Sequence, residues 1–393
     1  MKLEEHQGIP RSFLWLMATM AGVTVANLYY NQPLLESIRT ELGTTELMAN
    51  LITVITQIGY ALGLFWVIPM GDLYSRKRMI VANMLVAALM SLVIAFSTRI
   101  EWVWGASLLL GASSVVPQMF VPIAGQFSRP ENKSRNIGYV LSGLLIGILL
   151  SRVFSGLLGQ LLGWRIVFFI VSVLMTLCCG IALWVMPEMK HNFKGSYASL
   201  MRSVVAIFLS HPCIRLNSVR AAFGFGSILT VWACLSFHLA GPPFHAGADK
   251  VGLLGLCGVA GALVASGLGK YVERIGVRRF SLAGACIQMF SWLIAYLFGN
   301  TYWGLFLTVI LLDIGVQCLQ LSNQSASLQE IPEASNRINT IFMTTFFIGG
   351  SLGTFLAGQG WQALGWSGVC LVGFSLAFCS LLISVCGRVL SHR

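Results

Sequence analysis

Long apolar stretches separated by short polar segments run through the whole chain. Residues 13–35 contain no charged side chain, and at about 1.5 Å per residue they would cross the ~30 Å hydrocarbon core of a bilayer as a helix. The pattern therefore predicts an all-α membrane protein. Its twelve predicted transmembrane helices cover residues 13–35, 47–71, 79–98, 102–127, 137–162, 166–187, 215–239, 251–271, 280–299, 302–328, 338–362 and 366–387.

The longest polar stretch between these helices, residues 188–210, divides them six and six. It contains Lys190, Lys194 and Arg202 and is the candidate linker. We therefore expect an N-terminal six-helix bundle over residues 1–187, a linker over 188–210 and a C-terminal six-helix bundle over 211–393.

The two halves repeat each other in sequence, because Gly147 recurs as Gly349, 202 positions later, and other residues recur at the same shift. A parallel repeat of this kind predicts two pseudo-symmetric bundles with a cleft between them. The other repeated residues are Gly156, Gln160, Gly163 and Trp164, which recur as Gly358, Gln362, Gly365 and Trp366.

Composition also indicates a membrane protein. Of 393 residues, 56% are hydrophobic and only 10% are charged, against about 25% charged in soluble domains. If the N-terminus is cytoplasmic, nineteen of the 25 lysines and arginines lie in cytoplasmic segments and four in outer loops. The positive-inside rule therefore predicts that both termini and the linker are cytoplasmic, and it accounts for the net charge of +11 without a nucleic-acid partner.

A carboxylate and a basic turn follow both the second and the eighth predicted helix. Such a group can pair with neighbouring helix ends and hold the cytoplasmic face closed, so we call these residues the latch. Membrane anchoring by the basic residues is the alternative, but it does not account for a carboxylate placed alike in both halves. The latch comprises Asp72, Arg76 and Lys77 in the first half and Glu273, Arg274 and Arg278 in the second.

Two six-helix halves with these loops resemble the major facilitator superfamily over nearly the whole chain. The loop signature of that family runs Gly-x-x-x-Asp-Arg-x-Gly-Arg-Arg/Lys. The matching residues are Asp72, Arg76 and Lys77 in the first copy and Gly269, Arg274, Gly276 and Arg278 in the second, where Glu273 replaces the Asp. The resemblance implies the family's fold, with twelve transmembrane helices in two bundles.

Within that family, the glycine-rich residues 138–163 and the run from Ala26 to Pro33 resemble bacterial drug, sugar and nucleoside exporters that exchange substrate for protons. This resemblance implies a location in the bacterial inner membrane. Such exporters have an Arg where this chain has Ser107 and a Gly-Pro pair where it has Gly147 and Ile148. The usual proton relay of the group is therefore not carried over.

Three charged residues lie inside predicted helices and away from their ends: Asp313, Arg152 and Arg220. A charge near the middle of a transmembrane helix costs roughly 2.5–3.5 kcal/mol on insertion scales, so each needs a partner or a task. Counting residues from the helix midpoints puts Asp313 and Arg152 at similar depth, with Arg220 closer to the cytoplasm. We therefore expect Asp313 to pair with Arg152, either as a static link between the halves or as a pair that protonation breaks.

Polar side chains at helical spacing predict a substrate cleft, and hydrogen bonding between neighbouring helices is the alternative. Asp313, Gln317, Gln320 and Gln324 are four, three and four residues apart, which places them on one face of a helix. Such a neutral, amphipathic lining favours neutral or weakly polar solutes. The other predicted cleft residues are Asn27, Tyr30, Asn31, Gln57, Tyr60, Gln118 and Trp232.

These features predict a secondary active transporter, most consistent with proton-coupled efflux of a small organic solute by alternating access. Import by symport or facilitated diffusion is the alternative. We find no catalytic constellation, metal-ligand spacing or nucleotide-binding loop, so we predict neither an enzyme nor a cofactor. The expected partners are a small-molecule substrate, protons and the lipid bilayer, and the chain is expected to act as a monomer.

Overall fold

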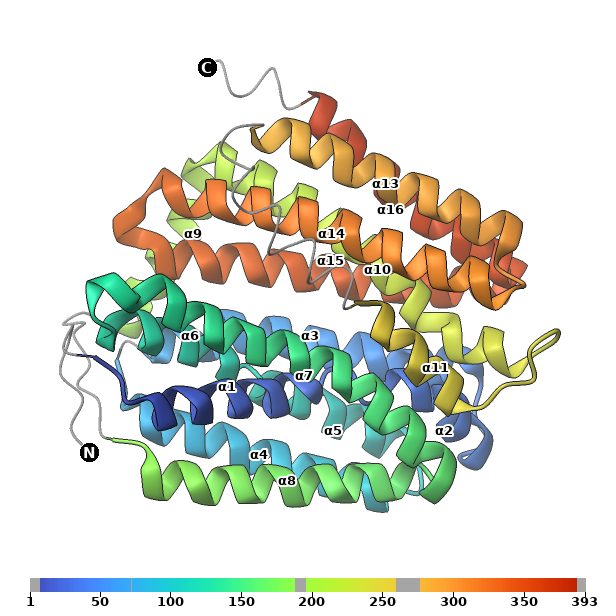
Figure 1. Ribbon diagram of the computed structural model, residues 1–393, viewed down its shortest axis with the longest axis horizontal. Helices are drawn as coiled ribbons and strands as arrows, with labels where there is room; N and C mark the ends of the chain where they lie inside the picture. The colour runs from blue at the N-terminus through green and yellow to red at the C-terminus, as the bar shows by residue number, and fades with distance from the viewer. Residues whose placement is uncertain (1–7, 72, 188–195, 259–275, 387–393) are drawn as a thin grey trace.

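The computed structural model describes residues 8–71, 73–187, 196–258 and 276–386, and its regular elements in those ranges are all helices. The helices run roughly parallel to one another in two groups, one from each half of the chain (Figure 1). We call the end at which α1 begins and α16 finishes the near end, and the opposite end the far end.

The first group contains α1 to α8. Ten helices of the described chain are long and apolar enough to cross a membrane, if α5 and α6 are counted as one. The bounds in the first group are α1 Arg11–Ala26, α2 Leu35–Glu41, α3 Glu46–Met70, α4 Arg76–Phe96, α5 Ile100–Ser113, α6 Val116–Phe127, α7 Lys133–Leu162 and α8 Trp164–Val185.

The second group contains α10 to α16, and α9 precedes it. The predicted helix 251–271 begins here as α11, and its residues after 258 lie outside the described ranges. The bounds are α9 Tyr197–Ser210, α10 Pro212–Ala240, α11 Ala248–Leu254, α13 Val277–Phe298, α14 Tyr302–Glu330, α15 Ser335–Leu364 and α16 Trp366–Cys386. The all-helical, two-bundle fold expected from the sequence is confirmed.

Two predicted helices are interrupted. The α-helical part of the first ends at Ala26, where the backbone N–H groups of Asn27 and Leu28 bond three residues back instead of four. Pro33, which has no N–H to donate, lies in the short 3₁₀ turn that follows. The fourth is split between Ser113 and Val116, just before Pro117.

The predicted linker contains a helix of its own. In α9 the side chains of Leu200, Val204 and Ile207 are buried and pack against the near ends of α3 and α15. The hydroxyl of Tyr197 donates to the backbone oxygen of Trp66 in α3, at 2.9 Å. The segment is therefore anchored to both groups of helices at the near end.

Glycines bring two pairs of helices into close contact, one pair in each half. In α7, a Cβ added to Gly147 would lie 2.2 Å from the backbone oxygen of Gly22 in α1. In α15, a Cβ on Gly349 would lie 2.3 Å from the backbone oxygen of Ala222 in α10. Small residues allow helix backbones to approach in a membrane, which explains why this glycine is part of the repeat.

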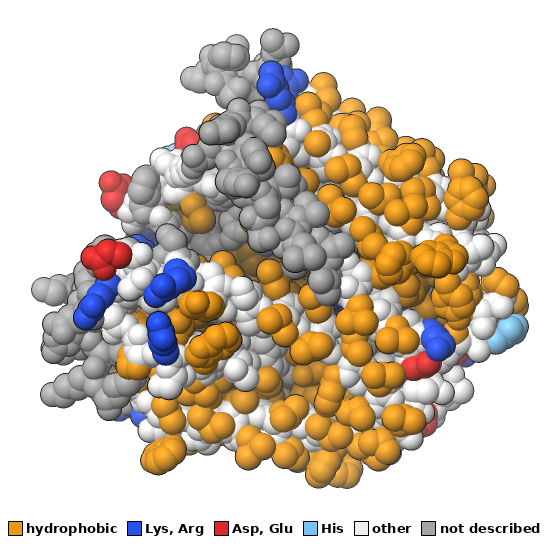
Figure 2. Space-filling model, in the orientation of Figure 1, with side chains coloured by type: hydrophobic (Ala, Val, Ile, Leu, Met, Phe, Trp, Pro, Cys, Tyr) orange, Lys and Arg blue, Asp and Glu red, His pale blue; other side chains and the backbone are white. Residues whose placement is uncertain are grey.

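Contacts between the groups follow the same pseudo-symmetry. Helix α3 packs against α15, and α7 packs against α11, so the second and eleventh predicted helices meet, as do the fifth and eighth. The outer flank is apolar: Figure 2 shows hydrophobic side chains over most of the visible surface, with charged ones gathered towards the ends. This distribution suits a chain surrounded by lipid.

Candidate functional site

A cavity of about 140 Å³ lies between the two groups of helices. Aliphatic residues of α7 form one side, and aromatic residues of α10 and α15 form another. The polar or amphipathic side chains that line it are Tyr29, Tyr60, Gln118, Arg152, Trp232, Asp313, Gln317 and Gln320.

Arg152 enters the cavity from α7 and is held by both halves. Its Nε donates to Oε1 of Gln32 at 2.8 Å. Its guanidinium carbon lies 4.0 Å from the ring centroid of Trp232 in α10 and 4.8 Å from that of Tyr29. Cation–π contacts of this kind become stronger when the cation is desolvated, and Arg152 is only 6% exposed.

Asp313 lines the same cavity from α14, in the other half. Its carboxylate lies against the backbone at Gly258, where an added Cβ would be 3.2 Å from Oδ2. Among the residues that the structure describes, Asp313 and Arg152 make no ion pair within 4.0 Å. The two charges therefore share a cavity without direct contact in this conformation.

Stacked aromatic rings form the wall opposite α7. The ring of Phe225 in α10 stacks on Phe346 of α15 with centroids 4.0 Å apart. Tyr60 of α3 contacts Phe347 at 4.4 Å, and its hydroxyl accepts a hydrogen bond from Gln118 at 3.4 Å. Aromatic faces next to amide and phenol groups suit a solute with both an apolar body and a few polar groups.

Several predicted cleft residues lie outside the cavity lining. Asn27 bonds to Ser114 within the first half, at 3.1 Å, and Asn31 bonds to Thr56 of α3, at 3.3 Å. Tyr30 packs on Phe154 of α7.

Two predicted cleft glutamines instead contact α15. Gln57 of α3 accepts a hydrogen bond from Thr354 at 3.4 Å, and Gln324 of α14 donates to Asn339 at 2.8 Å. The cavity lining thus includes only part of the predicted polar set.

Arg220 lies in a separate polar cluster within the second half. It donates to Oδ1 of Asn323 at 2.9 Å and to the hydroxyl of Ser281 at 3.5 Å. The side chain of Asn323 donates to the same hydroxyl, at 2.9 Å. Because α10, α13 and α14 each supply one member, the cluster joins three helices of one bundle and does not reach the cavity.

Among the lining residues that sequence reasoning missed are Tyr29, the aliphatic residues of α7, and Phe346 and Phe347 of α15. The tightened backbone after Ala26 directs Tyr29 to the cavity in place of the predicted Tyr30. Leu144, Leu145 and Ile148 have no polar signal that distinguishes them from lipid-facing residues.

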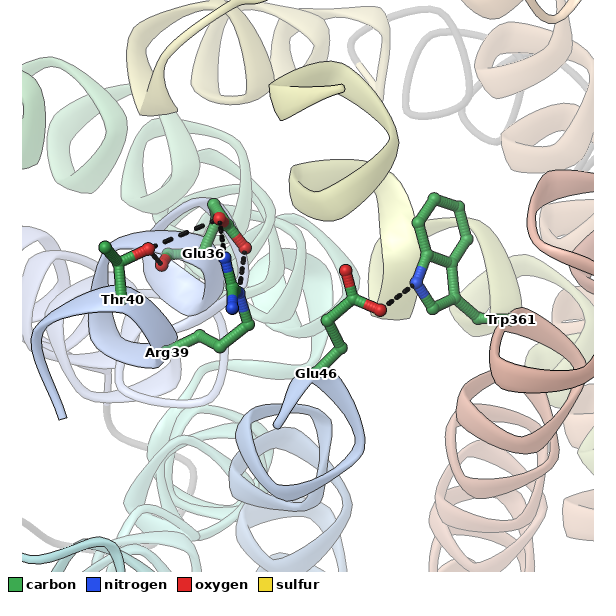
Figure 3. Close-up of polar contacts among 5 residues, drawn as sticks. All are labelled: Glu36, Arg39, Thr40, Glu46 and Trp361. Atoms are coloured by element: carbon green, nitrogen blue, oxygen red, sulfur yellow. Dashed lines mark hydrogen bonds and ion pairs between the residues drawn. The ribbon is translucent and has the colours of Figure 1, made fainter. Parts of the chain in front are cut away.

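The far end of the cavity is sealed by hydrogen bonds between the groups. The indole N–H of Trp361, in α15, donates to the carboxylate of Glu46, in α3, at 2.5 Å (Figure 3). Asn50 donates to the backbone oxygen of Ala233 at 3.2 Å. On the other side, Oε1 of Gln160 in α7 accepts from the backbone N–H of Ala248 in α11, at 3.2 Å.

A fixed charge lies beside the Trp361 contact. In α2, Arg39 donates to both carboxylate oxygens of Glu36, at 2.6 and 2.7 Å (Figure 3). This hydrogen bonding raises the pKa of the Arg39 guanidinium, and Glu46 acts in the same direction through its charge. Arg39 therefore keeps its positive charge next to this contact.

The cavity leads towards the near end. A second, smaller pocket of about 40 Å³ lies between α3, α6 and α15, and Gln118 lines both. Gln118 therefore links the central cavity to a pocket at the near end, whereas hydrogen bonds join the two groups of helices at the far end.

Two of the three described latch residues bind helix ends within their own halves. Arg76, at the start of α4, donates to Gln126 of α6 at 2.8 Å. Arg278, 202 positions later at the start of α13, donates to the backbone oxygens of Ser384 and Val385 in α16, at 3.1 and 3.4 Å. Lys77 lies half-buried in the first turn of α4. Asp72, Glu273 and Arg274 lie outside the described residues.

Comparison with known proteins gives a consistent result. The family model of the Major Facilitator Superfamily matches residues 14–354. The uncharacterized transporter YgaY of Escherichia coli is 36% identical over 370 residues, which cover 94% of this chain and 93% of that protein. A probable sugar efflux transporter of Helicobacter pylori is 24% identical over 76% of this chain and 71% of its own length.

A search of solved structures finds the same fold. The crystal structure of the nucleoside transporter NupG matches with a TM-score of 0.76 and 14% sequence identity, over 96% of this chain and 99% of that chain.

Proposed function

The chain belongs to the major facilitator superfamily and is a secondary transporter in a membrane, and we propose that it exports a small organic solute in exchange for protons. The single observation that carries this proposal is the cavity, where Asp313 of one half and Arg152 of the other face a common space. Changing the charge of either residue alters the attraction between the halves.

We propose that residues 1–187 and 211–393 move as two bodies, joined by residues 188–210, and that the near end is cytoplasmic. The excess of lysine and arginine in the segments at that end supports the orientation. With the far end sealed, the described conformation would load substrate from the cytoplasm, and both walls of the cavity come from one chain, so a monomer suffices.

Coupling would arise from the position of Asp313. A carboxylate among apolar groups favours its neutral form, and a nearby cation favours its charged form. For export in exchange for protons, Asp313 would take up a proton from the outer side while the far end is open, and the protonated carrier would return to the conformation described here. Release of that proton to the cytoplasm would restore the attraction of Asp313 to Arg152 and, with substrate bound, would favour the conformation in which the far end is open.

The lining favours a neutral or weakly polar substrate. Gln118, Gln317 and Gln320 can donate and accept hydrogen bonds, and the wall formed by Phe225 and Phe346 can stack on a flat apolar group. The similarity to a probable sugar efflux transporter supports sugars and related compounds as the first candidates.

Transport into inverted membrane vesicles tests the proposal, with a proton gradient imposed and sugars, nucleosides and dyes as substrates. Export by antiport predicts gradient-driven accumulation, which Asp313→Asn abolishes because the side chain no longer ionises. The matched control is Asp249→Asn, the same change on the surface of the same half, where Asp249 pairs with Lys250.

Other outcomes would contradict parts of the proposal. Transport that ignores the gradient would make the protein a facilitator. Accumulation in right-side-out vesicles driven by an inward gradient would make it a symporter. Gradient-driven export that survives Asp313→Asn would place coupling elsewhere.

A further inference from the structure

A basic cavity lies on the outer flank of the first bundle at the near end, apart from the central cavity. Its volume is about 690 Å³, and it is formed by the start of α1, the loop before α7 and the start of α7. Arg11, Arg129 and Arg135 line it together with Trp15 and Tyr139, and no acidic residue is among the described lining residues.

Two of these arginines have no protein partner in the described chain. Arg11 and Arg135 are exposed, and neither side chain takes part in a hydrogen bond or ion pair with any residue in the ranges that the structure covers. Like charges brought together repel each other unless an anion lies between them. Figure 2 shows basic side chains gathered at the left end, over the beginnings of α1 and α7, beside a hydrophobic surface.

The cavity opens onto a surface that suits lipid. The rings of Trp15 and Tyr139 lie 5.6 Å apart and are 61% and 40% exposed. Aromatic side chains of this kind are enriched where a membrane protein meets the headgroup region. Such a pair is expected at the level of the lipid headgroups, and the cavity shares no lining residue with the central cavity.

An exposed apolar strip leads away from the cavity along α7. Tyr139, Ile146, Leu150 and Leu157 are seven, four and seven residues apart, so they lie on one face of the helix, and all four are exposed. Leu150 follows Tyr139 by 11 positions, a rise of ~16 Å along the helix, which is about half of the ~30 Å hydrocarbon core. This is the length that one leaflet of acyl chains occupies.

We propose that this cavity binds the headgroup of an anionic phospholipid, whose acyl chains lie along the exposed face of α7. The arginines supply the charge that the phosphate requires, Tyr139 and Asn132 supply polar groups at the rim, and the strip accommodates the chains. Basic pockets between transmembrane helices on the cytoplasmic side commonly bind such headgroups.

Lipid binding to the purified full-length protein in detergent tests the proposal, with bound lipid counted by native mass spectrometry. We expect one phosphatidylglycerol to bind about 10-fold more tightly than phosphatidylethanolamine with the same chains. Arg11→Gln and Arg135→Gln should each weaken phosphatidylglycerol binding ~5-fold, and the double variant ~30-fold, from the usual contribution of a basic residue near an anionic headgroup. The matched control is Arg202→Gln with Arg279→Gln, two exposed near-end arginines outside the cavity.

Three results would overturn the proposal. Equal binding of the two phospholipids by the unmodified protein would exclude a headgroup site. Equal losses in the double variant and the control would indicate only diffuse attraction by surface charge. Binding of soluble glycerol phosphate as tight as that of phosphatidylglycerol would identify a free phosphate compound as the ligand. The single variants keep the test valid if the double variant does not fold, and none of these measurements depends on transport.

Discussion

The bond between Trp361 and Glu46 sets how firmly the far end closes, and Trp361→Phe tests this. The change removes the indole N–H that reaches Glu46 at 2.5 Å and keeps an aromatic ring against Phe237 and His238. A hydrogen bond to a charged group contributes ~1.5–3 kcal/mol. Because both side chains are half-buried, we expect this hydrogen bond to contribute ~1–2 kcal/mol. Its loss would shift the ratio of closed to open far ends ~5–30-fold.

Hydrogen exchange measured by mass spectrometry on the protein in lipid nanodiscs reports this shift. Peptides from the far ends of α3 and α15 should exchange faster in Trp361→Phe by up to the same factor, while those from the near end of α4 stay unchanged. Trp366→Phe is the matched control: its indole donates to the backbone oxygen of Ala295 at 2.9 Å, within one half. That variant should not open the far end.

Two results would refute this reasoning. If far-end exchange in Trp361→Phe equals that of the unmodified protein, the bond does not hold the halves together. If Trp366→Phe accelerates it equally, the effect is a general loss of stability. Glu46→Gln keeps an acceptor oxygen but loses the charge, so far-end exchange should rise less than in Trp361→Phe. The double variant of Trp361→Phe and Glu46→Gln should show less than the sum of the two single effects.

Two further changes test the packing. Gly147→Ala forces a Cβ towards Gly22 and should lower the free energy of unfolding by about 1–3 kcal/mol, measured by thermal unfolding. The matched control is Gly180→Ala, where an added Cβ meets nothing within 4 Å, and its free energy of unfolding should stay unchanged. Arg220→Gln loses its bond to Asn323 and should cost about 1–3 kcal/mol of stability while proton-driven transport persists; lost coupling at unchanged stability would assign Arg220 to the proton pathway.

The helices could be predicted because a membrane requires long apolar segments, and hydropathy reads that requirement directly. The interruptions could not be located in the same way. Pro33 and Pro117 mark them, but Pro69 in α3 and Pro122 in α6 lie inside helices that they do not interrupt. Which prolines end a helix depends on the neighbours that satisfy the freed carbonyls.

The candidate site was predictable where one helix supplied a whole face. Asp313, Gln317 and Gln320 line the cavity because α14 is regular over its length, so spacing alone defines their side. Spacing did not predict the position of Gln324, one turn further along α14. There α15 comes close, and the side-chain amide of Gln324 donates a hydrogen bond to Asn339. Spacing defines a face of a helix, while the neighbouring helix decides what that face meets.

The sequence repeat explains the arrangement of the far-end contacts, and its divergence explains their difference. Glu46 and Ala248 are 202 positions apart and begin α3 and α11, and each meets the far end of a helix in the other half. At Ala248 the bond is between neutral groups and contributes ~0.5–1.5 kcal/mol, whereas the bond to the charged Glu46 contributes ~1–2 kcal/mol. The contact of α3 with α15 is therefore stronger than the symmetry-related contact of α7 with α11. Removing the indole of Trp361 should make that edge open first, with exchange rising in α3 and α15 before it rises at the α7 side.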